Sequence, residues 1–162
     1  MPAGSGNWAA FWALGTNITS NGWPVSGEID IAEQWRFQNT RNTGAIHYST
    51  DALGCCTNHR FEAGEYYGED YSSDYHTYSL IWLPNSISLA VDGKTFFSRS
   101  SVSASTSLWP FEKPIFLIFN NAISDLSTNF NSWSGWNNSS MSIDYVRAFS
   151  INGVGSVFLA KE

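Results

Sequence analysis

Three acidic residues lie close together in a chain that is otherwise poor in charge. Glu28, Asp30 and Glu33 fall within six positions, whereas charged residues make up only 14% of the chain. Glu28 and Asp30 are two positions apart, so on a β-strand their side chains share one face. Glu33 joins that face if the strand contains one additional residue, which a β-bulge at 31–32 would supply. We therefore expect a bulged strand with these three carboxyl groups on one face and apolar residues behind them.

Such a cluster suits the cleavage of a glycosidic bond. Carboxyl groups this close cannot all ionise easily, so at least one of them should have a raised pKa. Cleavage with retention needs an ionised nucleophile and a protonated acid about 5–5.5 Å apart. Counting the bulge, Glu28 and Glu33 lie roughly 13 Å apart between Cα atoms at about 3.3 Å per residue, and side chains leaning over a bent strand would close that gap. A solvated strand face and a calcium site are the alternatives that the residues leave open.

Tryptophans surround the acidic strand in the sequence. The chain has eight of them, and Trp is large and rarely fully buried. Because the C–H faces of sugars stack on aromatic rings, tryptophans beside acids predict a saccharide cleft. We expect Trp23 to contact a ligand and keep Trp12 and Trp35 as further candidates. Trp8 shares a strand face with Trp12, which fits core packing equally well.

Composition excludes several classes of protein. The net charge is −6 and no cluster of positive charge is present, so nucleic acid is not expected as a partner. No apolar run approaches the roughly 20 residues of a membrane span. The 162 residues fit a single domain, 1–162. Cys55 and Cys56 are adjacent and cannot join distant segments, and with His47 and His59 they match no zinc spacing, so we interpret them as loop cysteines.

The elements that must position these residues are short strands. Clusters of Gly, Asn and Ser separate segments that alternate in polarity or are continuously apolar, which predicts an all-β sandwich or barrel with very little helix. The segments are 75–82, 86–91, 94–98, 114–119 and 141–149. Asp92-Gly93 between two of them is a strong hairpin signal. The continuous run at 114–119 predicts a strand buried on both faces.

The sequence GEIDIAE at 27–33 resembles the E-x-D-x-x-E signature of glycoside hydrolase family 16, in the bulged form found in laminarinases, which are endo-β-1,3-glucanases. Further similarity to that family follows in family order over most of the chain. The similar segments are 8–15, 22–24, 75–82, 91–93, 109–114, 119–120 and 144–147. The resemblance implies a curved, concanavalin-like jelly roll of two sheets with a cleft on its concave face.

The resemblance also implies an activity and the residues that perform it. Glu28 would be the nucleophile and Glu33 the acid/base of a retaining endo-glycosidase, and Asp30 would tune the protonation of both. The expected substrate is β-1,3-glucan such as laminarin, and mixed-linkage β-1,3-1,4-glucan is a second candidate. No cofactor would be required. A secreted protein of polysaccharide degradation is expected, and the low charge and plentiful Ser, Asn and Trp suit it.

The resemblance places further residues around the cleft. Trp23 would line the glycone side of the cleft. His47, His76 and Asn120 would lie near it. Asp144 would contribute to a structural calcium site on the convex side, together with main-chain oxygens near the N-terminus.

The chain also departs from the family pattern. We expect it to lack the strands that precede position 8 in family members, and its first residues have neither the basic nor the apolar region of a signal peptide. Ala9 replaces a common Pro, and 121–125 differs from a Gly-rich turn. An incomplete sandwich would expose apolar surface and strand edges, so we expect the chain to form a homodimer or to rearrange.

Two alternatives to an active β-1,3-glucanase follow from these departures. The chain would be a non-catalytic module that binds glucan in an incomplete cleft, or a product with neither activity nor binding. Among other substrates of the fold class, sulfated carrageenan is disfavoured by the negative charge, whereas neutral agarose is compatible with it.

Overall fold

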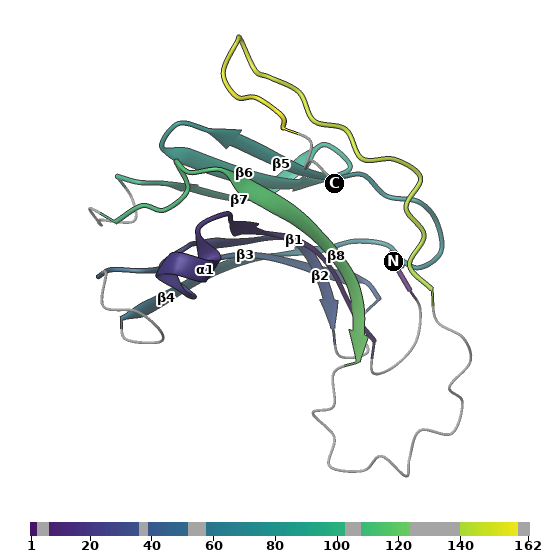
Figure 1. Ribbon diagram of the computed structural model, residues 1–162. Coiled ribbons are helices and arrows are strands. Elements are labelled where there is room, and N and C mark those ends of the chain that lie inside the picture. The colour runs from purple at the N-terminus through teal and green to yellow at the C-terminus, as the bar shows by residue number, and fades with distance from the viewer. Residues whose placement is uncertain (3–6, 36–38, 52–57, 103–107, 124–139, 159–162) are drawn as a thin grey trace.

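The computed structural model describes residues 1–2, 7–35, 39–51, 58–102, 108–123 and 140–158. These residues form two antiparallel sheets and one short helix (Figure 1). The elements in chain order are β1 (Asn7–Gly15), α1 (Ile18–Asn21), β2 (Glu28–Trp35), β3 (Arg41–Ser49), β4 (His59–Tyr67), β5 (Tyr78–Leu83), β6 (Ser86–Val91), β7 (Lys94–Ser100) and β8 (Ile115–Ile123). The expected all-β fold with two sheets is therefore confirmed.

The sheets differ in size and form two layers. The larger sheet has the order β4-β3-β2-β1-β8, and the smaller one has the order β5-β6-β7. Figure 1 shows the larger sheet curving beneath the smaller one. Strand β2 contacts β5 and strand β4 contacts β7 across the two layers. The central strand of the curved sheet is β2, which carries the acidic cluster.

The hydrophobic core lies between the layers. Its buried members come from β1, β2 and β3 on one side and from β6, β7 and the segment before β8 on the other. They are Ala13, Ile29, Ile31, Ile46, Tyr48, Ile87, Leu89, Phe97 and Phe111. Each fully buried aliphatic side chain contributes about 1.5–3 kcal/mol relative to exposure. Because the isoleucines of β2 face this core, the acids that alternate with them face away from the smaller sheet.

The predicted hairpin is present in the smaller sheet. Strands β6 and β7 pair through a turn at Asp92 and Gly93, whose φ angles are +48° and +76°. Two consecutive positive φ angles identify the type I′ turn that Asp-Gly favours.

The expectation for 114–119 is wrong in one respect. These residues do form most of β8, but Phe116 is 40% exposed and Leu117 is 42% exposed. Strand β8 lies at the edge of the larger sheet, where it pairs with β1 alone among the described strands. A continuous apolar run therefore reflects an edge strand here rather than one covered on both faces.

The alternating segment 141–149 does not form the expected strand. Among the described residues, it pairs with neither sheet, and a single bridge joins Ile151 to Val154 just after it. Its larger apolar side chains after Met141 are exposed, from Ile143 at 47% to Phe149 at 78%. An alternating pattern indicates which residues would share a face of a strand, but it does not specify the strand with which they pair. In the described part of the chain, no helix is long and apolar enough to cross a membrane.

Candidate active site

A β-bulge in β2 brings the three acids to one face, as the sequence predicts. Asp30 pairs with Trp12 of β1, whereas the next pairing joins Ala32 to Phe11, so one residue of β2 is left over. The register with β3 shifts in the same place, between Asp30 and Glu33. Ile31 is the additional residue, and it is fully buried. The bulge therefore reverses the alternation so that Glu33 faces the same way as the other acids.

A glycine sets the start of β2. Gly27 has φ of +80°, a conformation that L-residues with side chains rarely adopt. A Cβ at this position would lie 2.8 Å from Cγ of Pro110 and 3.0 Å from Cε1 of Phe111. The backbone thus passes close to the segment before β8 immediately before Glu28. A side chain at 27 would displace either that segment or the first acid.

Each glutamate accepts a hydrogen bond from a tryptophan. Nε1 of Trp23 donates to Oε2 of Glu28 at 3.1 Å. Nε1 of Trp8 donates to Oε1 of Glu33 at 2.9 Å. An indole N–H can only donate, so both bonds favour an acceptor oxygen and hold the carboxyl group in one orientation.

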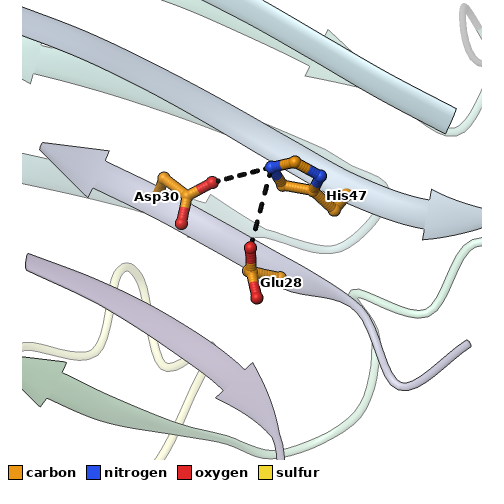
Figure 2. Close-up of side chains that lie close together, drawn as sticks. All are labelled: Glu28, Asp30 and His47. Atoms are coloured by element: carbon orange, nitrogen blue, oxygen red, sulfur yellow. Dashed lines mark ion pairs between the residues drawn. The ribbon is translucent and has the colours of Figure 1, made fainter. Parts of the chain in front are cut away.

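His47 joins two of the acids from the neighbouring strand. It lies directly opposite Glu28 in the register of β2 with β3. Its Nε2 is 3.2 Å from Oδ2 of Asp30 and 3.6 Å from Oε1 of Glu28, as Figure 2 shows. Its Nδ1 is 2.9 Å from Nε2 of His59 on β4. The imidazole therefore connects the carboxyl groups to a second histidine on the adjacent strand.

Burial governs the acidity of the cluster. Burial, reinforced by the charge of Asp30, raises the pKa of Glu28 to about 7. The same two causes raise the pKa of Glu33 to about 7, and burial raises that of Asp30 to about 7. Burial also lowers the pKa of His47, against the attraction of the neighbouring carboxylates. Near neutral pH this face therefore holds protonated and ionised acids side by side, as acid–base catalysis requires.

Aromatic rings line one side of the cluster. The ring of Trp23 lies 4.6 Å from that of His59 and 5.8 Å from that of His47. Phe61 lies 4.8 Å from His47 and is 57% exposed. Phe61 is thus an exposed apolar ring beside the half-buried rings of His47 and Trp23, and such rings suit the C–H face of a sugar.

Trp12 and Asn120 are held together on the other side of β2. Nε1 of Trp12 donates to Oδ1 of Asn120 at 2.7 Å, and Nδ2 of Asn120 donates to the carbonyl of Trp8 at 3.3 Å. Trp12 lies opposite Asp30, and Asn120 on β8 lies opposite Ala10. Strands β1 and β8 thus extend the acidic face beyond β2.

The remaining expected residues lie elsewhere or outside the described part. Trp35 ends β2 opposite Trp8, and its side chain is outside the described residues. His76 contacts Asp92 through Nδ1 at 2.8 Å and packs against Tyr71 at 5.0 Å. These contacts do not connect it to the acids of β2, and its place near the cleft stays a prediction.

Two further expectations concern metals and thiols. Asp144 is exposed and belongs to no cluster of three or more acidic, histidine or cysteine side chains in the described ranges, so calcium there stays a prediction. In those same ranges the ligand atoms of Glu28, Asp30 and His47 do form such a cluster. Cys55 and Cys56 lie outside the described residues.

Sequence reasoning did not place His59 and Phe61 in this site and left Trp8 undecided. His59 and Phe61 are two positions apart and therefore share one face of β4, and Phe61 lies directly opposite His47. Their spacing is visible in the sequence. The register that brings these two side chains beside His47, however, depends on the pairing between β3 and β4.

Comparisons with known proteins show the family to which the chain belongs. A family model described as "Glycosyl hydrolases family 16" matches residues 1–147. The glucan endo-1,3-beta-glucosidase A1 of Niallia circulans is 31% identical over 162 residues, which cover 92% of this chain and 23% of that protein. A beta-1,3-glucan-binding protein of Penaeus monodon is 30% identical over 118 residues, or 68% of this chain and 31% of that protein.

A solved structure is similar in fold. The laminarinase catalytic domain of Thermotoga maritima MSB8 superposes with a TM-score of 0.65 at 32% sequence identity. The match covers 76% of this chain and 49% of that domain. The chain thus spans less than two thirds of each of these relatives.

Proposed function

Because the chain belongs to family 16 of the glycosyl hydrolases, we propose that it is a retaining endo-glycosidase that hydrolyses β-1,3-glucan. Mixed-linkage β-1,3-1,4-glucan is a second proposed substrate. The observation that carries the proposal is the bulge of β2, which collects two glutamates and an aspartate with pKa values of about 7 on one open face. Related proteins named glucanase and laminarinase support the substrate class.

In the proposed mechanism, Glu28 is the nucleophile. Its ionised carboxylate attacks the anomeric carbon, and the bond between that carbon and the leaving oxygen breaks. The hydrogen bond from Trp23 holds one oxygen of Glu28, and His47 lies 3.6 Å from the other. Both contacts favour the ionised form that nucleophilic attack needs.

Glu33 is the acid and then the base. Its proton passes to the leaving oxygen in the first step, and a glycosyl ester on Glu28 results. In the second step Glu33 takes a proton from water, the water oxygen attacks the anomeric carbon, and Glu28 leaves as a carboxylate. A pKa of about 7 keeps a substantial share of Glu33 protonated at neutral pH.

Asp30 tunes the two glutamates in this proposal. It lies between them on the strand, and its charge raises the pKa of both. His47 lies within ion-pair distance of Asp30 as well as of Glu28, so a charge on Asp30 also acts on the ring beside the nucleophile.

Aromatic and amide side chains would bind the sugar chain. We propose that Trp23 stacks on the glycone side and that Trp12 and Asn120 contact sugars further along β1 and β8. His76 and Trp35 remain further proposed contacts. A calcium ion at Asp144 would have a structural role only, and the chemistry above requires no cofactor.

Product analysis tests the proposal. The purified chain is incubated with laminarin, lichenan and agarose, and reducing ends are measured together with product lengths. We expect release of oligosaccharides from laminarin. Glu28→Gln should abolish hydrolysis because no glycosyl ester can form, and Glu33→Gln should lower kcat by at least about 10²–10⁴-fold, the range for a lost acid or base. Circular dichroism checks that both variants remain folded. Turnover of laminarin by either folded variant at the parent rate would contradict the assignment.

Glucan binding without hydrolysis is the second candidate function. The similarity to a protein named beta-1,3-glucan-binding protein supports it. Calorimetric titration with laminari-oligosaccharides separates the candidates. Binding without any new reducing ends would favour the binding module, whereas the presence of both glutamates on one face favours hydrolysis.

We further propose that residues 1–162 act as one extracellular domain and associate as a homodimer. A polysaccharide substrate is too large to enter a cell intact, which is the reason for the extracellular location. Exposed apolar side chains on β8 and on 140–158 are the reason for the dimer.

A further inference from the structure

We propose that Glu28, Asp30 and His47 bind a divalent transition-metal ion of the zinc class, and that this ion inhibits the enzyme by occupying the nucleophile. The inference goes beyond the proposed hydrolysis because ion binding is measured without any sugar. It begins from the geometry of Figure 2, where one imidazole nitrogen and two carboxylate oxygens converge.

The spacing of the ligand atoms fits a tetrahedral ion. One atom from each side chain lies within 4.8 Å of the other two. Nε2 of His47 is 3.2 Å from Asp30 and 3.6 Å from Glu28. Nitrogen and oxygen ligands at about 2.1 Å from a tetrahedral zinc lie roughly 3.4 Å from one another. The two measured separations lie on either side of that value. The carboxylate oxygens of Glu28 and Asp30 lie within 4.8 Å of each other, and binding would bring them to about the same spacing.

The burial of Asp30 is a second reason to propose a metal ion at this cluster. This residue is only 3% exposed, and its Oδ2 forms no hydrogen bond of normal geometry in the described part of the chain. That oxygen nevertheless points toward Nε2 of His47 (Figure 2). A buried carboxylate oxygen without a hydrogen bond is costly to maintain. A metal ion between the two atoms would satisfy both of them.

His59 contacts the ring nitrogen of His47 that faces away from the two carboxyl groups. A metal-binding histidine normally donates its other ring N–H to a neighbouring group, which fixes the tautomer. Nδ1 of His47 is 2.9 Å from Nε2 of His59, so His47 can donate there and leave the lone pair of its own Nε2 toward the carboxylates.

The donor set selects the class of ion. Calcium takes about 6–8 oxygen ligands, and magnesium prefers octahedral oxygen coordination. One imidazole and two carboxylates instead suit zinc and similar ions with three protein ligands and one open position. Because one of the ligands is the proposed nucleophile, the bound ion would withhold its electron pair from the anomeric carbon.

Calorimetric titration with zinc chloride at neutral pH tests the proposal. The parent protein for the test carries Cys55→Ser and Cys56→Ser, because thiolates also bind zinc. We expect one ion per chain. His59→Gln should weaken binding by about 10–100-fold, as loss of an outer partner does, and His47→Gln, which removes a direct ligand, should weaken it at least as much. His76→Gln is the matched control, since His76 contacts a single carboxylate, that of Asp92, and it should keep the parent affinity.

Thermal unfolding and hydrolysis give two further readouts. Zinc should raise the unfolding temperature of the parent and of His76→Gln but not of His47→Gln. Where laminarin is hydrolysed, zinc should inhibit it reversibly, with recovery on adding a chelator. Absence of zinc binding in the parent, or equal binding by His47→Gln and His76→Gln, would overturn the proposal whether or not the chain is an enzyme.

Discussion

Asp30 adds its charge to the effect that burial has on the two glutamates of the site. It is the most buried of the three acids, and its charge raises the pKa of both glutamates. Asp30 therefore raises the pH at which Glu33 loses its proton, and it raises the pH at which Glu28 ionises as well. Burial raises these two pKa values most, and the charge of Asp30 shifts them further, so Asp30 helps to set the pH range in which the nucleophile is ionised and the acid is protonated.

We expect Asp30→Asn to move the pH profile of kcat/KM to lower pH. Without the charge at 30, the pKa of Glu28 and that of Glu33 both fall, so the acidic limb and the alkaline limb shift in the same direction. The measurement is laminarin hydrolysis over pH, with folding checked at each value. A profile that stays in place or moves to higher pH would show that Asp30 does not tune its neighbours.

Ionisation of Glu33 should lower the free energy of unfolding of the protein. Its pKa rises from the ordinary glutamate value of 4.5 to about 7 in the fold, so the folded protein holds this proton more tightly than the unfolded chain does. The contribution of Glu33 to the free energy of unfolding is therefore highest below pH 4.5, and it falls as pH rises from there through about 7.

Glu33→Gln should accordingly stabilise the protein above neutral pH. We expect a gain on the order of 1 kcal/mol, or about 2–4 °C in Tm, that disappears at acidic pH. Thermal unfolding across the pH range measures it, and the same substitution at the exposed Glu69 is the matched control. An equal effect of Glu33→Gln at acidic and alkaline pH would contradict the pKa assignment.

At the scale of elements, the start of β2 depends on Gly27. Both its positive φ and its close approach to Pro110 exclude a side chain. Gly93 in the hairpin turn has a similar φ of +76°, but a Cβ there would meet nothing within 4 Å. A substitution at Gly93 would therefore add backbone strain alone, whereas a substitution at Gly27 would add both strain and a steric clash.

Gly27→Ala should destabilise the protein more than Gly93→Ala does. Backbone strain costs each variant about 1–2 kcal/mol. The clash at Pro110 and Phe111 should add about 1–3 kcal/mol for Gly27→Ala, the usual cost of overpacking. Denaturant unfolding gives both values. Equal losses would mean that the segment before β8 does not constrain the first acid.

The sequence allowed prediction of those elements whose signal is local. Alternation and Asp92-Gly93 predicted the β6–β7 hairpin, and the odd spacing of Glu33 predicted the bulge, because each follows from the period of a single strand. Whether 114–119 is covered, and whether 141–149 finds a partner, depends on neighbouring strands. The role of His59 likewise depends on register with β3. Strand coverage, strand pairing and register depend on contacts between segments far apart in the sequence, so a local sequence pattern does not predict them.

At the scale of the whole molecule, apolar side chains remain exposed outside the core. Phe116 and Leu117 lie on the edge strand β8, and Phe149 and Phe158 lie on 140–158 with 78% and 81% exposure. Exposed apolar patches and strand edges favour association between chains.

We expect a homodimer in solution whose population falls on dilution. Phe149→Ser should shift it toward monomer without unfolding, because this side chain is 78% exposed. Size-exclusion chromatography with light scattering over a range of concentrations measures both effects. A well-folded monomer at every concentration would remove the reason for proposing a dimer.

The most direct test of the account is to trap the ester on Glu28. A 2-deoxy-2-fluoro laminaribiosyl fluoride carries a leaving group that needs no proton, and the fluorine at C2 slows the second step, so a retaining enzyme accumulates its glycosyl ester. We predict that intact-mass spectrometry shows one added disaccharide unit per chain, that peptide mapping places it on Glu28, and that Glu28→Gln acquires none. A label on another residue, or hydrolysis of laminarin with inversion at the anomeric carbon, would contradict the account.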